Sequence, residues 1–131
     1  QLESLRQAGR SLVQAGRFEE AAERYSVAID LFGNEANSGD AGQLAVLFGN
    51  RSLCELKLRR YKEAQQDAST AVSLDPNYAK GYYRLALCKM ETADLAGAWE
   101  DADRAARLAP DDAGVKALVK QIFVLEHGPQ T

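Results

Sequence analysis

Histidine and cysteine, on which most metal sites and many catalytic sites depend, are scarce in this chain of 131 residues. The single histidine, His127, lies near the carboxyl end, and the two cysteines, Cys54 and Cys88, are far apart with no CxxC spacing. So few ligands exclude the common zinc sites and the histidine-based catalytic arrangements. We expect the two cysteines to be reduced and buried, as they are in proteins of a reducing compartment.

Long hydrophobic runs and an excess of positive charge are also missing. No apolar stretch approaches the ~20 residues that cross a membrane, and the first residues carry too much charge for a signal peptide. A net charge of −3 with a pI near 5.2 argues against a general nucleic-acid binder or a protein of anionic membranes. Only three prolines stand among many Ala, Leu, Glu and Arg residues, and 46% of the chain is apolar. This composition favours a helical globular domain.

A repeated segment is the strongest pattern that is present. Residues 61–76 recur at 95–110, so that Ala64 and Pro76 have counterparts 34 residues later. An earlier copy contains Ala21, which precedes Ala64 by 43 residues, or one repeat plus nine inserted residues. The segment 33–42 is rich in glycine and asparagine, and we expect it to be a loop that holds the insertion.

Each copy contains two segments of helical periodicity, which predicts a helix hairpin. Asp75-Pro76 and Ala109-Pro110 should separate successive hairpins, because proline is disfavoured inside a helix. A last apolar stripe cannot be buried alone, so it should form a seventh helix that covers the third hairpin. The prediction is one all-α domain, with hairpins at about 2–32, 43–76 and 77–110, a capping helix at about 111–126 and a tail at 127–131.

The pattern resembles the tetratricopeptide repeat, a unit of two antiparallel helices that stacks into a right-handed superhelix. The family's spacing is met in the three copies by Leu5, Ala8, Gly9, Leu12, Ala21 and Tyr25, by Phe48, Ser52, Ala64, Ala68 and Pro76, and by Tyr82, Ala86, Ala98, Ala102 and Pro110. We expect Gly9 and Ala86 to meet Ala21 and Ala98 where the helices of a hairpin approach closely. Other large residues fill the family's tryptophan position.

In such a superhelix the first helix of each hairpin lines a concave groove. The groove positions carry five basic and two acidic residues, although the chain is acidic overall. A groove that is basic at its floor and apolar along its length suits an extended peptide that ends in a carboxylate. Small Gly49 should leave room for the ligand backbone, whereas Leu87 and Met90 fit the core and the groove equally well. The groove residues so assigned are Val13, Val46, Gly49, Leu53, Leu56, Lys57, Tyr83, Leu87 and Met90.

Five polar groove residues resemble the carboxylate clamp of co-chaperone tetratricopeptide domains, which hold the C-terminal E-E-V-D tails of heat-shock protein 90 and heat-shock protein 70. By this resemblance the clamp is Arg6, Arg10, Asn50, Lys80 and Arg84, with Arg10 in the place of an asparagine. Several cations and one amide donor can satisfy the two carboxylates of a terminal aspartate. We expect Lys80 and Arg84 to be exposed and unimportant for folding. Arg6 and Arg10, one helical turn apart, should repel each other unless an anion lies between them.

Other conspicuous residues are better explained by structure. Cys54 and Cys88 occupy the same repeat position, which favours a packing role, and Trp99 should pack within its hairpin. Arg59 and Arg60 fall at a turn between helices, where solvated basic residues are common. The acidic residues Glu63, Glu100, Asp101 and Asp103 are predicted to form solvated helix faces and not an acid–base pair.

These patterns predict a non-catalytic, monomeric, peptide-binding module without a cofactor, in the cytoplasm or the nucleus. The leading hypothesis is a co-chaperone or chaperone adaptor that binds acidic C-terminal tails. The alternative is a scaffold that binds an internal segment or helix of one dedicated partner within a larger multi-domain protein. A requirement for a free C-terminus would distinguish the two, because an internal motif would be insensitive to amidation of a peptide.

Overall fold

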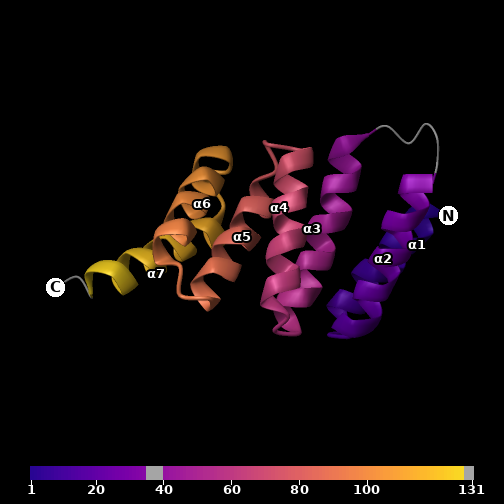
Figure 1. Cartoon of the computed structure of the whole chain (residues 1–131), viewed down its shortest axis with the longest axis horizontal. Helices are drawn as coiled ribbons and strands as arrows, with labels where there is room; N and C mark the ends of the chain where they lie inside the picture. Colours follow the sequence, from indigo (N-terminus) through magenta and orange to yellow (C-terminus); the bar gives the residue numbers. More distant parts are fainter. Residues whose placement is uncertain (35–39, 129–131) are drawn as a thin grey trace.

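The computed structural model describes residues 1–34 and 40–128, which contain seven α-helices and no strand. Figure 1 shows the helices side by side in one row, with α1 and α2 at one end and α7 at the other. The predicted all-α solenoid is confirmed. The helices are α1 (Leu2–Gln14), α2 (Phe18–Asn34), α3 (Ala41–Lys57), α4 (Tyr61–Leu74), α5 (Ala79–Glu91), α6 (Leu95–Leu108) and α7 (Ala113–His127).

The turn inside each hairpin has the same backbone conformation. One residue of positive φ follows the first helix of each pair: Gly16 at 76°, Arg59 at 62° and Ala93 at 64°. The next N–H then donates to a carbonyl five residues back, at 2.8 Å in all three turns. This bond satisfies a carbonyl that the helix end would otherwise leave unpaired. Only the first turn uses glycine, so Arg59 and Ala93 adopt a conformation that disfavours a Cβ.

The expected loop at 33–42 is too long at both ends. The last turn of α2 includes Gly33 and Asn34, and α3 begins at Ala41. The second boundary is set by Asp40, whose carboxylate accepts hydrogen bonds from the N–H groups of Gly42 at 2.9 Å and Gln43 at 3.3 Å. An aspartate in this position stabilises the first turn of a helix. Residues 35–39 of the expected loop lie outside the described residues.

Two later helices also begin further along the chain than expected. The first residue of α5 is Ala79, because Asp75 and Tyr78 form a turn in which the Tyr78 N–H donates to the Asp75 carbonyl at 3.1 Å. The first residue of α7 is Ala113, because the carboxylate of Asp112 caps the N–H of Val115 at 3.0 Å. At its other end α7 includes His127, which was expected in the tail.

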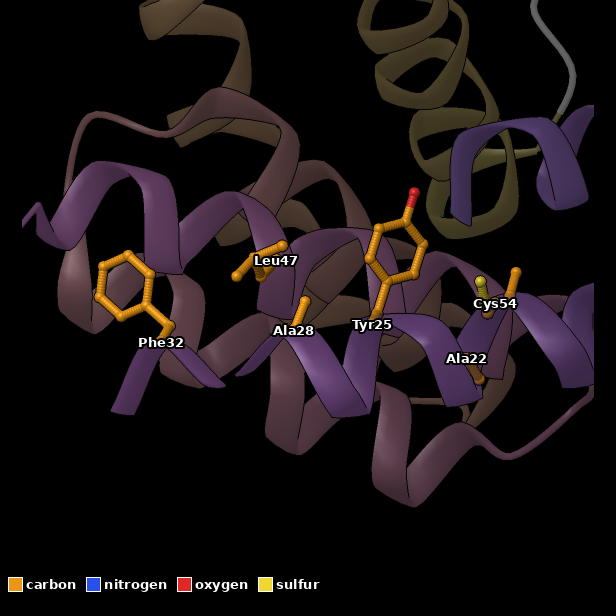
Figure 2. Packing of buried hydrophobic residues seen from close by; sticks show 7 residues of the cluster. Ala22, Tyr25, Ala28, Phe32, Leu47 and Cys54 are labelled. Carbon is orange, nitrogen blue, oxygen red and sulfur yellow. The ribbon is translucent and has the colours of Figure 1, made fainter. Parts of the chain in front are cut away.

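The core lets neighbouring helices approach closely because most of its residues are small. In the first hairpin Gly9 is covered by the ring of Tyr25, whose Cζ would lie 2.6 Å from a Cβ at that glycine. The expected neighbour, Ala21, belongs to the same cluster. Figure 2 shows Tyr25, Ala28 and Phe32 along α2. A side chain at Gly9 would therefore separate α1 from α2.

The last helix covers the end of the third hairpin. Leu118 and Ile122 of α7 form a buried cluster with Ala86 of α5 and with Ala98 and Ala102 of α6. The seventh helix therefore protects the apolar face that the third hairpin would otherwise expose, as the sequence pattern predicts.

Candidate ligand-binding cleft

A cleft of about 570 Å³ opens among the first helices of the three hairpins. Residues of α1, α3 and α5 form its walls, with contributions from α2 and from the turn before α5. This is the position that stacking of helix hairpins predicts for a concave groove. Its lining residues are Arg10, Val13, Gln14, Tyr25, Val46, Asn50, Leu53, Asp75, Asn77, Tyr78, Ala79, Lys80 and Arg84.

A larger hollow of about 810 Å³ runs along α4, but it has fewer charged side chains that could bind a ligand. Glutamine, serine and threonine side chains line most of it, and its only charged residues are Lys62 and Asp67. Asp67 is already engaged by Arg51 at 2.7 Å. The smaller cleft, with three cations and few carboxylates, is the better candidate for a ligand site.

Arg84 of α5 is a buried cation at the edge of the cleft, with only 8% of its surface exposed. Its Nη1 donates to the hydroxyl of Tyr78 at 3.3 Å, and its Nε is buried without a hydrogen-bond partner in the described chain. No carboxylate of residues 1–34 or 40–128 forms an ion pair with it. The expectation that Arg84 is exposed is wrong, because the packing of neighbouring hairpins encloses a residue that the repeat register places on the groove face.

Asn50 and Lys80 lie in the same cleft as Arg84. Lys80 is exposed and Asn50 is half-buried, and neither side chain pairs with another residue in the described part of the chain. An amide and an ammonium group are therefore free to donate hydrogen bonds to a ligand beside the guanidinium group. Such a combination of donors, with no acceptor among them but the amide oxygen, suits an anion.

Arg6 and Arg10 of α1 share a carboxylate within the chain. Glu3 places Oε2 at 3.4 Å from Arg6 Nη1 and Oε1 at 3.4 Å from Arg10 Nη2. The expected repulsion between the two arginines is thus relieved by Glu3, without a ligand. Arg10 lines the cleft, whereas Arg6 lies outside its lining.

Arginines of α1 and α5 nevertheless affect the same group, the hydroxyl of Tyr25. Burial raises the pKa of the Tyr25 hydroxyl and Cys54 adds to that rise, whereas the positive charges of Arg10, Arg6 and Arg84 oppose it. Tyr25 is 1% exposed and forms part of the cleft lining. The three arginines therefore contribute positive potential at Tyr25, two of them from α1 and one from α5.

Only part of the expected apolar groove faces the cleft. Val13, Val46 and Leu53 line it, whereas Leu56 and the exposed Lys57 do not. The space over Gly49 is taken by Tyr78, whose hydroxyl a Cβ at Gly49 would strike. Gly49 thus makes room for a side chain of the protein itself and not for a ligand backbone.

The remaining expected groove residues pack toward the capping helix. Tyr83, Leu87 and Met90 rest on the cluster that α7 completes. Tyr83 also lines a hollow of about 180 Å³ between α5 and the start of α7, together with Lys80 and Arg84. Leu87 and Met90 are half-buried against this cluster, so part of each side chain has a packing role.

Two tyrosines line the cleft that the sequence pattern does not predict there. Tyr25 comes from a second helix and Tyr78 from a turn, so neither falls on the groove positions of a first helix. Gly49 was a usable signal for Tyr78, because a glycine on a buried helix face often marks a close neighbour. The sequence does not say which side chain that neighbour is.

Outside the cleft, a partly buried ion pair joins three helices. Arg51 of α3 donates from Nε and Nη2 to the carboxylate of Asp67 on α4, both at 2.7 Å, and from Nη1 to Ser26 Oγ on α2 at 3.2 Å. Glu55, one turn from Arg51, is raised in pKa by burial and by the neighbouring Asp67. This cluster connects the first two hairpins and lies away from the cleft lining.

The two cysteines lack the properties of reactive thiols, and the described residues form no metal site. Cys54 and Cys88 are free and buried, and burial raises the pKa of Cys54 to about 11 and that of Cys88 to about 12. Thiols with such pKa values are poor nucleophiles at neutral pH. In the described ranges no three His, Cys, Asp or Glu residues come together as a metal site, and no helix is long and apolar enough to cross a bilayer.

Comparisons with known proteins identify the repeat. Residues 45–78 match the profile of the family described as Tetratricopeptide repeat. The Hsp70-Hsp90 organizing protein of Triticum aestivum is 38% identical over 109 residues, which are 83% of this chain and 17% of that protein. The crystal structure of the myosin chaperone UNC-45 from C. elegans in complex with a Hsp90 peptide has a TM-score of 0.84 at 26% identity, over 95% of this chain and 14% of that one.

The chain belongs to the tetratricopeptide repeat family. Serine/threonine-protein phosphatase 5 of Rattus norvegicus also matches, with 34% identity over 114 residues, or 87% of this chain. The tetratricopeptide chain spans only 17% and 21% of the length of these two curated relatives. The likeness therefore concerns one segment of each relative, and in this tetratricopeptide segment the cleft lies on the first helices of the hairpins.

Proposed function

We propose that this tetratricopeptide chain is a non-catalytic module that binds the acidic C-terminal tail of a chaperone. The expected tail is of the E-E-V-D type, carried by heat-shock protein 90 and heat-shock protein 70, and the expected role is that of a co-chaperone or chaperone adaptor. Support comes from a relative named as an Hsp70-Hsp90 organizing protein and from a structural neighbour solved with a Hsp90 peptide.

The observation that carries the proposal is the buried, unpaired Arg84. Taking a cation out of water is costly unless an opposite charge or several hydrogen bonds compensate. Arg84 has one hydrogen bond, to Tyr78, and no carboxylate partner in the described chain. A carboxylate bound in the cleft supplies the missing counter-ion, and Asn50 and Lys80 are placed beside it to donate further hydrogen bonds.

The proposed roles follow from the position of each residue. Arg84, Lys80 and Asn50 hold one carboxylate of the terminal residue. Arg10, assisted by the charge of Arg6, holds the other from the opposite end of the cleft. Val13, Val46 and Leu53 provide the apolar wall against which the preceding ligand side chains pack.

The expected affinity is modest. Each charge-assisted hydrogen bond contributes about 1.5–3 kcal/mol. Ordering a flexible peptide costs a large part of that gain, so binding of a short tail near micromolar is expected. The free, buried thiols fit a reducing compartment, and we place the protein in the cytoplasm or the nucleus as a monomer.

The proposal is tested by isothermal titration with two forms of one synthetic peptide ending in Glu-Glu-Val-Asp, the free acid and the C-terminal amide. Amidation removes one negative charge and should weaken binding by at least about tenfold, which is ~1.4 kcal/mol. Lys80→Ala should weaken binding of the free acid without affecting folding, because Lys80 is exposed. Equal affinity for acid and amide would reject terminal-carboxylate recognition and favour an internal segment as the ligand.

A further inference from the structure

Two glycines make a slot for the ring of Tyr78 beside the cleft. Tyr78 lies in the turn before α5, and one edge of its ring, from Cδ2 to the hydroxyl, lies against Gly49 of α3 and Gly81 of α5. A Cβ at Gly49 would strike the hydroxyl and lie 2.7 Å from Cε2, and a Cβ at Gly81 would lie 3.0 Å from Cδ2. The absence of a side chain at both glycines therefore lets this edge of the ring pack closely on α3 and α5, and that packing positions the hydroxyl before a ligand arrives.

The hydroxyl has an unused donor. It accepts a hydrogen bond from Arg84 Nη1 at 3.3 Å, and in residues 1–34 and 40–128 no acceptor is recorded for its own hydrogen. A phenolic hydroxyl can donate one hydrogen bond while it accepts others. Tyr78 lines the same cleft as Asn50 and Lys80, so this free O–H belongs to the set of donors there.

We propose that Tyr78 is a further ligand-binding residue of the cleft: its hydroxyl accepts from Arg84 and donates its hydrogen to the carboxylate of the bound peptide. This inference rests on the function proposed above. A carboxylate only accepts, so the O–H is a complementary partner. The bond from the guanidinium group polarises the hydroxyl and makes it a stronger donor. Because the slot fixes the ring, little side-chain freedom is lost on binding.

The test variant is Tyr78→Phe, which keeps the ring in its slot and removes only the hydroxyl. Binding of the Glu-Glu-Val-Asp peptide is measured for the free acid and the amide at low and high salt. The free-acid affinity should fall at least about tenfold, the loss expected for one hydrogen bond to a charged group. Because the variant removes no charge, the salt dependence of binding should match that of the parent, whereas Lys80→Ala should reduce it.

The matched control is Tyr82→Phe, four residues further along the chain in α5. The Tyr82 ring faces Arg104, with Cζ of the arginine 5.6 Å from the ring centroid, and the residue is not part of the cleft lining. Its affinity for both peptides should be unchanged. Gly49→Ala is a second variant, because its methyl group would displace the Tyr78 hydroxyl while the tyrosine itself is kept. This variant should also lower the affinity for the free-acid peptide more than the affinity for the amide.

Three outcomes overturn the inference. Free-acid binding by Tyr78→Phe that equals that of the parent would show that the hydroxyl makes no contact with the ligand. Equal losses for acid and amide would assign Tyr78 a packing role. Failure of the parent protein itself to distinguish acid from amide would reject the proposed function and this inference together, whereas selectivity in the parent with no effect of Tyr78→Phe rejects the inference alone.

Discussion

Arg84→Met separates the contribution of Arg84 to binding from its contribution to folding. The substitution keeps an unbranched side chain and removes the buried charge. The folded protein loses one long hydrogen bond from the charged guanidinium group to Tyr78, at 3.3 Å, which contributes about 1.5 kcal/mol, the lower end of the range for charged groups. It is also relieved of a buried unpaired Nε, which costs about 1–3 kcal/mol. The free energy of unfolding of the unliganded protein should therefore stay level or rise by up to about 1.5 kcal/mol.

Binding should change in the opposite direction. Loss of a buried cation from the cleft removes at least one charge-assisted hydrogen bond, so free-acid affinity should fall by tenfold or more, about 1.4 kcal/mol. Urea unfolding without peptide measures the first quantity, and isothermal titration measures the second. A fall in stability of more than about 1 kcal/mol would refute the reasoning, because Arg84 would then be a structural residue whose charge is already compensated.

The control for this comparison is Arg107→Met on α6. The side chain of Arg107 is 74% exposed and pairs with Asp103 one turn away. Exposed pairs of this kind contribute little, so both stability and peptide affinity should change by less than about 0.5 kcal/mol.

Three further predictions concern the turns, Glu3 and Glu55. Ala93→Gly should raise the free energy of unfolding by about 0.5–1 kcal/mol, since Ala93 has a φ of 64°, and Gly16→Ala should lower it; urea midpoints that move the other way would contradict this. Glu3→Gln should tighten free-acid binding about two- to threefold at low salt, because Glu3 occupies Arg6 and Arg10, and the gain should vanish at high salt; no gain at low salt would show that the pairs do not compete with the ligand. Burial holds the pKa of Glu55 above its usual 4.5, so the folded state keeps a proton that the unfolded state releases, and stability from this group falls as pH rises above 4.5. Glu55→Gln should flatten that decline in a series of urea titrations, and identical pH profiles would exclude it.

The fold could be predicted from the sequence because the repeat and its helical periodicity occur three times, and each copy predicts the same pair of helices. Helix ends could be predicted less well. Asp40 and Asp112 cap the N-termini of α3 and α7. The glycines near Asp40 suggested a longer loop before α3, whereas Pro110 suggested that α7 begins at about residue 111, before its capping aspartate.

The sequence predicts which residues face the cleft, but it predicts neither the burial of Arg84 nor the position of Tyr78. The repeat register gave the face on which Arg10, Asn50, Lys80 and Arg84 lie, and the structure brings these four into one cleft. Burial of Arg84 depends on how adjacent hairpins pack, which no single repeat encodes. Tyr78 enters from a turn and closes the space over Gly49, and a periodicity argument about helices does not describe a turn residue.

The most direct test of the central claim follows the side-chain amide of Asn50 by ¹⁵N-correlated nuclear magnetic resonance, with Asn50→Ser to assign its signals. Asn50 lines the cleft and has no partner in the described chain, so its NH₂ signals should move as the free-acid Glu-Glu-Val-Asp peptide binds, and they should saturate at the dissociation constant found by calorimetry. The amidated peptide should cause a much smaller shift at the same concentration. Asn50 signals that remain in place while the peptide saturates, with backbone shifts gathered on α2 and α4 instead, would place the ligand elsewhere and contradict the account.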